Sequence, residues 1–308
     1  MAFALVTGGA GFIGSHIVEG LLKEGHKVRV VDSLITGYEK NLASVMDEIE
    51  FIKADIADDG VAEGACEGVD YVFHEAAVPT VPGSFEKPFV NQKSGEIATL
   101  KVLEAARKAG VKRLMFAASA AAYGNLPGLP KRESDPVDPL SPYAVSKLAG
   151  EYYLKSYALE HGLDTVSLRY FNVFGPRQDP NSQYSGVISV FHKLLSKGIQ
   201  PKIYGNGGQT RDFIYVGDVA RANIAAMNSQ TPLNGSVINI AGGKAVSILQ
   251  LAEMMAEALG VKLDPVIEPE RSGDVRDSLA DVSRANELLG FKAEVNIAEG
   301  LKWLCQTA

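Results

Sequence analysis

The stretch Phe3-Ala4-Leu5-Val6-Thr7-Gly8-Gly9-Ala10-Gly11-Phe12-Ile13-Gly14-Ser15 decides the fold of this chain. Its first five residues are strand formers, and three glycines follow at the spacing G-x-x-G-x-x-G: Gly8, Gly11 and Gly14. Apolar residues then recur at helical spacing as far as Leu22. The pattern predicts a strand that turns sharply into a helix, where residues without a Cβ let backbone N–H groups approach a pyrophosphate. Glycines that serve packing alone are the alternative, because one such triplet is weak evidence.

A carboxylate strengthens the phosphate-binding interpretation. The run Lys27–Asp32 is a second strand candidate, and Asp32 stands eighteen positions after Gly14. An acid at the tip of that strand accepts hydrogen bonds from adenine-ribose hydroxyls and repels an added 2′-phosphate. The sequence therefore predicts NAD rather than NADP as cofactor, the alternative being that Asp32 only ends a strand.

Length and composition limit the number of domains, the kinds of partner and the cellular location to be expected. A chain of 308 residues suggests about two domains. Its net charge of −7 and pI near 5.4 argue against nucleic acid or an anionic membrane as partner. The two cysteines, Cys66 and Cys305, have neither metal-ligand spacing nor a disulfide pattern. No signal peptide or transmembrane span is expected, and a reducing cytoplasmic location fits.

Strand-like and helical runs alternate through the first half of the chain. Further strands are predicted over 50–54, 70–74, 113–117 and 165–170, with helices over 58–65, 89–109 and 142–161. Strands that are apolar on both faces predict an α/β fold, a doubly wound parallel sheet of the Rossmann type. Asp55, Ala76 and Ala77 follow predicted strands, at the sheet edge where such folds bind ligands. Tight packing is the alternative for each of these small or polar residues.

Past Tyr170 the pattern changes. A turn-rich break covers 175–181, and further helices are expected near 184–197, 217–228, 247–259, 281–289 and 297–305. Short strands are expected at 202–204, 213–216 and 237–240. We therefore predict an NAD-binding domain over residues 1–171, with returning segments near 211–245, and a smaller α/β substrate lobe mainly over 172–308.

Two local patterns indicate proton transfer. Ser119 ends the fifth predicted strand, and Tyr143 and Lys147 share one face of a helix at spacing i, i+4. A free phenol has a pKa of about 10, which a nearby ammonium and a cationic nicotinamide would lower into a useful range. Ser119 would then bind the same substrate oxygen. The tyrosine–lysine spacing means little alone, but its combination with the glycine turn and strand-end serine is specific.

With these motifs in place, the chain resembles the extended short-chain dehydrogenase/reductases, and most closely the UDP-glucose and UDP-N-acetylglucosamine 4-epimerases among them. The resemblance spans nearly the whole chain and rests on Thr7 to Gly14, His74-Glu75-Ala76-Ala77, Ser119 to Gly124, Tyr143 to Lys147, Arg169 to Arg177, Arg211 to Ile214 and Arg271 to Asp274.

The resemblance extends the site. The cofactor-binding residues predicted from pattern and resemblance together are Gly8, Gly11, Phe12, Ile13, Gly14, Asp32, Asp55, Ile56, Ala76, Ala77, Tyr143, Lys147 and Tyr170. The substrate-binding residues are Ser119, Asn172, Val187, Tyr204, Arg211, Arg271, Asp274 and Ser278. Arginine forms forked bonds to phosphate, and an aromatic such as Tyr204 can pack against uracil.

The residues after Ser119 separate reaction types within the family. The resemblance implies Asp and Glu there in sugar 4,6-dehydratases, and a Glu in nucleotide-sugar decarboxylases, whereas this chain has Ala120 and Ala121. Methyl groups transfer no protons. We therefore expect epimerisation at carbon 4 through a transient 4-keto sugar. A dehydrogenase or other NAD-dependent nucleotide-sugar enzyme, and a non-catalytic NAD sensor, are the alternatives; the sensor would not need the Tyr–Lys pair.

Three further expectations come from the resemblance. Gly95 and Ala98 stand where the family usually has Asn and Gly, and Asn91 is a candidate substitute in a shifted register. A homodimer is implied through the helices over 89–109 and 142–161. Ser278 stands where a bulky residue excludes a carbon-2 N-acetyl group, so its small side chain predicts that UDP-N-acetylglucosamine is accepted beside UDP-glucose.

Overall fold

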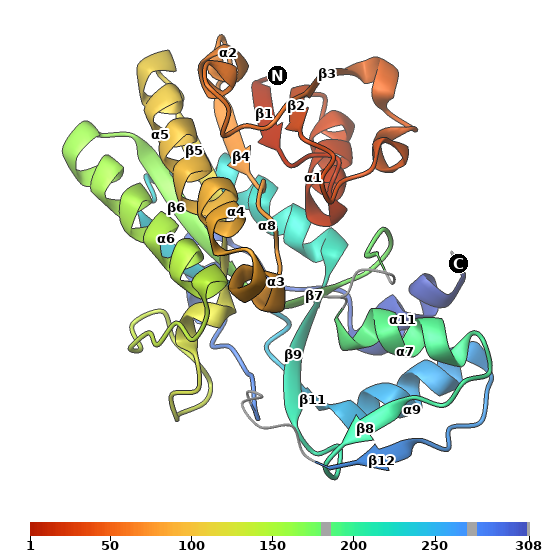
Figure 1. The fold of residues 1–308 in the computed structure, drawn as a ribbon. Coiled ribbons are helices and arrows are strands. Elements are labelled where there is room, and N and C mark those ends of the chain that lie inside the picture. The colour runs from red at the N-terminus through yellow and green to blue at the C-terminus, as the bar shows by residue number, and fades with distance from the viewer. Residues whose placement is uncertain (180–185, 270–275, 307–308) are drawn as a thin grey trace.

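A seven-stranded parallel sheet forms the centre of the computed structural model, which describes residues 1–179, 186–269 and 276–306 (Figure 1). The strand order is β10-β6-β5-β4-β1-β2-β3, and every neighbouring pair is parallel. The bounds are β1 (Phe3–Thr7), β2 (Lys27–Asp32), β3 (Ile49–Lys53), β4 (Tyr71–His74), β5 (Arg113–Ser119), β6 (Asp164–Tyr170) and β10 (Ser236–Ile240). The predicted doubly wound parallel sheet is confirmed.

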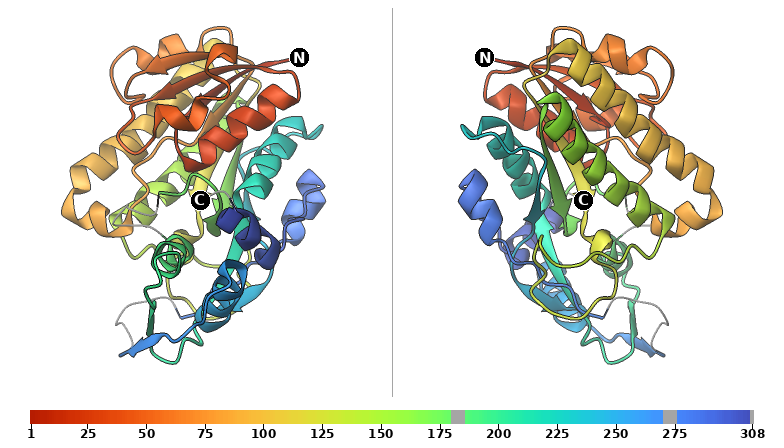
Figure 2. Two further views of the ribbon diagram at one scale, coloured as in Figure 1. Left: turned by 90° about the vertical axis from the view of Figure 1, so that its right-hand side faces the viewer. Right: turned by 90° about the vertical axis from the view of Figure 1, so that its left-hand side faces the viewer.

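Helices cover both faces of this sheet, as Figures 1 and 2 show. One face carries α2 (Val61–Cys66), α5 (Ala98–Ala109) and α6 (Pro142–His161), and the other carries α1 (Phe12–Lys23), α8 (Val216–Asn228) and α10 (Ser283–Leu289). Alternate residues of β1 enter opposite cores: Leu5 packs with the α2 and α5 side, while Ala4 and Val6 pack with the α1 side. This two-sided burial explains the unbroken apolar runs of the strands.

The predicted helix over 89–109 contains an irregular turn. It consists of α4 (Pro88–Gln92), a π-helical turn η3 (Lys93–Ile97) and α5, and a short unpredicted helix, α3 (Val81–Glu86), precedes it. A π turn inserts an extra residue into a helix. Gly95 lies in this turn, and a Cβ there would lie 2.9 Å from Ser146 Oγ on α6. The glycine thus permits close packing of the two helices.

A second lobe begins one residue after β6. It contains a three-stranded sheet in the order β11-β9-β7 and a parallel pair β12-β8. Its elements are β7 (Asn172–Phe174), α7 (Val187–Leu195), β8 (Lys202–Tyr204), β9 (Thr210–Tyr215), β11 (Ala245–Ser247), α9 (Ile248–Leu259), β12 (Val266–Glu268) and α11 (Ile297–Gln306). Helices α7, α9 and α11 enclose a separate apolar core. Helix α8 and strand β10 return to the large sheet. The division of the chain at residue 171 stays a prediction.

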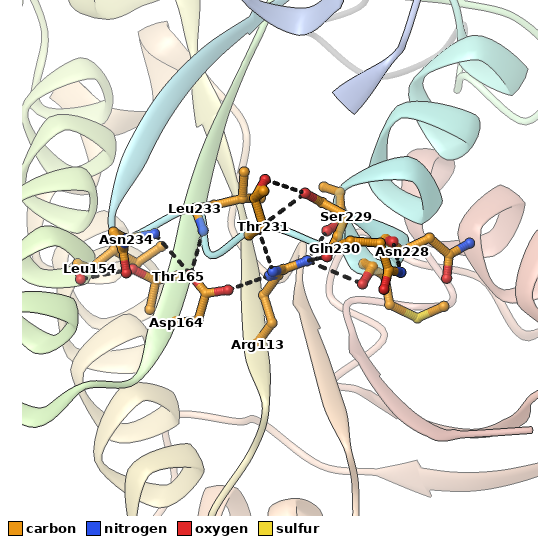
Figure 3. Close-up of polar contacts among 12 residues, drawn as sticks. Arg113, Leu154, Asp164, Thr165, Asn228, Ser229, Gln230, Thr231, Leu233 and Asn234 are labelled. Atoms are coloured by element: carbon orange, nitrogen blue, oxygen red, sulfur yellow. Dashed lines mark hydrogen bonds and ion pairs between the residues drawn. The ribbon is translucent and has the colours of Figure 1, made fainter. Parts of the chain in front are cut away.

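A buried ion pair fastens one of these returning segments (Figure 3). Arg113, at the start of β5, pairs with Asp164 at the start of β6 through Nε and Oδ2 at 2.6 Å. The same guanidinium donates to the carbonyl oxygens of Ala226, Met227, Ser229 and Thr231. Asp164 Oδ1 accepts from the backbone N–H groups of Leu233 and Asn234. These contacts fix the path from α8 into β10.

The remaining short turns are η1 (Glu39–Leu42), η2 (Met46–Glu48) and η4 (Ala120–Tyr123). Among the helices in the described ranges, none is both long and apolar enough to cross a membrane.

Candidate active site

The glycine turn joins β1 to α1 as predicted, and it has no room for side chains. Gly8 has a φ of +70°, and a Cβ there would lie 2.8 Å from the backbone nitrogen of Ala76. A Cβ on Gly14 would lie 2.3 Å from the carbonyl oxygen of Gly8. Gly11 is the N-cap of α1 and provides no side-chain cap. The first turn of α1 therefore presents backbone N–H groups and a positive helix end, which fits a pyrophosphate.

Asp32 holds this turn in place. Its Oδ2 accepts from the N–H of Ala10 at 2.9 Å, and its Oδ1 accepts from the N–H of Leu34 at 2.8 Å. Burial raises the pKa of Asp32, and these two hydrogen bonds oppose that shift. Because a carboxylate offers about four acceptor positions, two remain for the hydroxyls of a ribose. Asp32 can therefore hold the glycine turn and bind the ribose of the cofactor at the same time.

The other predicted cofactor residues line neighbouring strand ends. Ala76 donates its N–H to Thr7 Oγ1 at 3.2 Å, directly beside the glycine turn. Asp55 forms an ion pair with Lys93 at 2.9 Å, so its carboxylate is already engaged. Ile56 packs in the core on the α2 and α5 side of the sheet. Ala77, Phe12 and Ile13 are half-buried.

His74 lies beneath this site as a structural residue. Its Nδ1 lies 2.7 Å from Thr7 Oγ1, and its Nε2 lies 3.1 Å from Thr99 Oγ1. Thr99 donates to the carbonyl oxygen of Gly95, so it accepts from Nε2–H, and Nδ1 accepts from Thr7. Burial, with the charge of Lys147 adding to it, lowers the pKa of His74 to about 3. The imidazole is therefore neutral and is not a base for the substrate.

Tyr143 and Lys147 both lie on α6, which begins at the predicted residue. Ser141 caps the helix by accepting from the N–H of Ala144 at 3.1 Å. Lys147 is 5% exposed, and its Nζ donates to the carbonyl oxygen of Ala117 at 2.7 Å. Burial lowers the pKa of Lys147.

Ser119 meets Tyr143 at the end of β5. The Ser119 side chain interacts with the phenol of Tyr143, and the Ser119 Oγ accepts from the N–H of Ala121 at 3.2 Å. Burial raises the pKa of Tyr143, although the Ser119 hydrogen bond opposes the shift. The sequence predicted a lowered pKa for Tyr143. In the protein without cofactor the pKa is raised instead, because burial of the phenol is the largest effect.

Glu75 and Asn223 also belong to this site, although neither was predicted as a site residue. The hydroxyl of Tyr170 donates to Glu75 Oε1 at 2.9 Å, and it accepts from Asn223 Nδ2 at 2.7 Å. Glu75 directly follows β4, so its place at the ligand-binding edge could have been recognised. Asn223 lies within α8, and no local pattern distinguishes it from other helical residues.

Three of the predicted substrate residues, Asn172, Arg211 and Ser278, lie on or beside neighbouring strands of the second lobe. Asn172 begins β7, and its Nδ2 donates to the carbonyl oxygen of Asp212 at 3.0 Å. Arg211, on the neighbouring strand β9, donates to the carbonyl oxygens of Thr210 and Arg276. The N–H of Ser278 donates to the Thr210 carbonyl oxygen at 3.2 Å, which places Ser278 beside β9.

Val187 and Tyr204 come from other elements of this lobe. Val187 is the first residue of α7, and Tyr204 ends β8. Both are half-buried. Arg271 and Asp274 lie outside the described residues.

Asp212 connects β9 to the segment that carries Ser278. Its side chain is fully buried and accepts from the N–H groups of Gly242, Gly243 and Ala280. Burial raises the pKa of Asp212 to about 6, and the backbone hydrogen bonds oppose the shift. The segment around Ser278 therefore has a fixed place relative to Asn172 and Arg211.

A pocket of about 570 Å³ lies elsewhere, between the end of β10 and α10. Its lining includes Pro130, Asn239, Asn286 and Phe291, but none of the predicted site residues. We therefore assign the candidate active site by its chemistry at Ser119 and Tyr143.

Known proteins match this chain along its length. The family model described as "NAD dependent epimerase/dehydratase family" matches residues 4–241. A putative UDP-glucose 4-epimerase of Methanocaldococcus jannaschii is 40% identical over 300 residues, covering 97% of this chain and 95% of the relative.

Two solved structures are similar in both fold and sequence. The UDP-N-acetylglucosamine 4-epimerase of Methanobrevibacter ruminantium, in complex with UDP-N-acetylmuramic acid, has a TM-score of 0.94 and 41% identity, covering 99% of this chain and 97% of its own. The UDP-glucose 4-epimerase of Thermus thermophilus, in complex with NAD, has a TM-score of 0.88 and 37% identity, covering 99% and 98%.

Proposed function

The chain belongs to the NAD-dependent epimerase/dehydratase family, and from this premise we propose that it inverts carbon 4 of UDP-hexoses with NAD as cofactor. The observation that carries the proposal is the buried hydrogen bond from Lys147 Nζ to the carbonyl oxygen of Ala117, two residues before Ser119, with Tyr143 one helical turn before the lysine on α6. This arrangement can take a proton from a sugar hydroxyl and later return it.

The neighbouring residues favour epimerisation over elimination or decarboxylation. Ala120 and Ala121 follow Ser119 in the turn η4. Elimination of water needs an additional titratable group beside the sugar, and two methyl groups do not supply one. The 4-keto sugar formed by oxidation would then turn over and be reduced on its opposite face.

The chain has residues that fit NAD. The glycine turn would hold the pyrophosphate, Asp32 the adenine ribose, and Tyr170 the nicotinamide side of the cofactor. When bound, NAD supplies the acceptor for a hydride from carbon 4 and returns it to the same carbon. Tyr143 acts as the base in the first half of the reaction and as the acid in the second. Ser119 orients the reacting oxygen, and Lys147 favours the phenolate.

The UDP portion would lie against the second lobe. Arg211 on β9 and Asn172 on β7 come from adjacent strands, and Asn172 lies just beyond the carboxyl end of β6. A guanidinium there forms charge-assisted bonds to a diphosphate. Arg271, which lies outside the described residues, is proposed as its partner, and Tyr204 as a surface for uracil.

The test is direct conversion of a UDP-sugar. Purified protein is incubated separately with UDP-glucose and UDP-N-acetylglucosamine without added cofactor, and the products are separated by chromatography. We expect the corresponding UDP-galactose and UDP-N-acetylgalactosamine. Loss of water or CO₂ from the sugar would instead indicate a lyase, and Tyr143→Phe protein is the control.

We also propose a homodimer through α6 and the preceding helix. Val145, Tyr152 and Leu159 recur every seven residues on α6 and are 46%, 60% and 72% exposed. Phe89, 84% exposed, lines a shallow pocket of about 280 Å³ together with Val145. A stripe of this kind favours burial against another copy. Light scattering tests this proposal, since Leu159→Glu should yield monomers.

The free thiols of Cys66 and Cys305 support the proposed cytoplasmic location.

A further inference from the structure

Glu75 is a carboxylate inside the candidate site to which the proposed reaction gives no role. It directly follows β4, and its N–H donates to the carbonyl oxygen of Thr7 at 3.2 Å. A Cβ on Gly8 would lie 3.0 Å from the carbonyl carbon of Glu75. The backbone of Glu75 is therefore fixed against the glycine turn, and its side chain begins at the ligand-binding edge of the sheet.

A directed chain of hydrogen bonds ends on this carboxylate. Asn223 is fully buried, and its Nδ2 donates both to the carbonyl oxygen of Val219 and to the hydroxyl of Tyr170. Tyr170 in turn donates to Glu75 Oε1 at 2.9 Å. Since the Tyr170 oxygen already accepts from Asn223, Glu75 is the acceptor in the last bond. An ionised carboxylate is the stronger acceptor, so the chain favours the charged form.

The groups that face Glu75 come from three elements. Helix α6 supplies Lys147 and Tyr143, and β6 supplies Tyr170. Strand β5 supplies Ala117: His74 pairs with Phe116, so the next residue, Glu75, lies in register beside Ala117, whose carbonyl oxygen accepts from Lys147 Nζ. Burial lowers the pKa of Lys147 and raises that of Glu75, and attraction between the two opposite charges opposes both shifts. The negative charge of Glu75 also raises the pKa of Tyr143. Lys147 itself donates to Ala117, so Glu75 acts on it through the electrostatic field of the pocket.

We propose that Glu75 is a positioning residue whose carboxylate keeps Lys147 an ammonium ion and sets the pH range in which Tyr143 works as a base. The inference rests on the proposed function, because it assumes that Tyr143 exchanges the proton of the sugar hydroxyl. A buried lysine without a counter-charge tends to lose its proton. Glu75 prevents that loss, and it opposes ionisation of Tyr143 until other positive charge is present.

The experiment removes the charge and preserves the shape. Glu75→Gln retains an oxygen that accepts from Tyr170, so a purely structural role would survive. Without the negative charge, the pKa values of Tyr143 and Lys147 both fall. We expect both limbs of the pH profile of kcat to move toward acid by roughly one pH unit. Glu75→Asp keeps the charge and should leave the limbs in place even where kcat falls, and the exposed Glu67→Gln is the surface control.

A second measurement needs no turnover. In protein labelled with ¹³C at tyrosine Cζ, the Tyr143 resonance is identified by its absence in Tyr143→Phe, and its pKa is compared between wild type and Glu75→Gln. The expected result is a lower pKa in Glu75→Gln. Should that variant not fold, Glu75→Ser removes the same charge. An unchanged or raised Tyr143 pKa overturns the proposal. If wild-type protein converts no UDP-sugar, the proposed function fails while this titration still decides the role of Glu75.

Discussion

The Nζ of Lys147 lies 2.7 Å from the carbonyl oxygen of Ala117, which joins α6 to β5 two residues before Ser119. The bond is buried and the lysine is 5% exposed. It connects α6 to the strand end, so that Tyr143, one helical turn before Lys147, keeps its place beside Ser119. One ammonium hydrogen is used in this way, and two remain for ligands.

Tyr143→Phe and Lys147→Ala should each lower kcat for UDP-sugar epimerisation by about 10²- to 10⁴-fold, the usual scale of general acid–base catalysis. Ser119→Ala should cost less, because it removes one hydrogen bond but not the titrating group. The measurement is initial rate under saturating substrate. Tyr157→Phe, which removes a phenol from α6 outside the proposed dimer stripe, is the matched control and should retain activity. Near-normal turnover in Tyr143→Phe protein would contradict the mechanism.

Asp32→Ala should narrow the preference for NAD over NADP, because it removes both the ribose acceptor and the charge that repels a 2′-phosphate. It should also weaken binding of NAD itself, since Asp32 holds the N–H groups of Ala10 and Leu34. Calorimetric titration of cofactor-free protein with each dinucleotide measures both effects. The proposed role of Asp32 is wrong if the wild-type protein binds NADP as tightly as NAD.

Turnover should be redox-neutral. The hydride taken from carbon 4 returns to the same sugar, so product should accumulate without a steady rise in the absorbance of reduced nicotinamide. Recording absorbance and product together in one reaction tests this expectation. NADH formed in proportion to product would select the dehydrogenase alternative.

The sequence predicted those elements whose start and end signals lie in neighbouring residues. Helix α6 covers the predicted residues 142–161, because a Ser-Pro start and a Gly162 stop are written in adjacent residues. The strands β7, β11 and β12 have three residues each and show too little alternation to be recognised. The role of Asn223 was not predictable, because it depends on α8 returning to Tyr170 across 53 positions of sequence.

Arg113→Met should lower the free energy of unfolding by about 3–5 kcal/mol, the cost of breaking a buried ion pair by removing one partner. The change leaves Asp164, whose side chain is 15% exposed, without its counter-charge and removes a donor from four carbonyl oxygens, of which, within the described ranges, only that of Thr231 still accepts from the Ser229 hydroxyl. Arg113→Lys is the matched control: it keeps the charge but cannot span all these acceptors, so an intermediate loss is expected. Denaturant unfolding measures the difference. Equal stability of Arg113→Met and wild type would show that the cluster in Figure 3 is not what fastens α8 to the sheet.

Ser278 should determine which carbon-2 substituents the site accepts. Its N–H donates to the carbonyl oxygen of Thr210, and the Thr210 hydroxyl donates to Asp277 Oδ1 at 2.8 Å. Arg211, the proposed phosphate-binding residue, follows Thr210 on β9. The position of Ser278 relative to Arg211 is therefore fixed. A small residue removes a steric barrier without creating attraction for either sugar.

We therefore expect wild-type protein to convert UDP-N-acetylglucosamine beside UDP-glucose. Ser278→Tyr should selectively lower kcat/KM for the acetylated substrate, because the ring would occupy the space of the acetyl group, whereas a carbon-2 hydroxyl still fits. Ser278→Ala, equally small, is the control and should preserve both activities, which separates side-chain volume from loss of the hydroxyl. If wild-type protein converts UDP-glucose and leaves UDP-N-acetylglucosamine untouched, the size of residue 278 does not control entry, and selection must lie in another part of the sugar pocket.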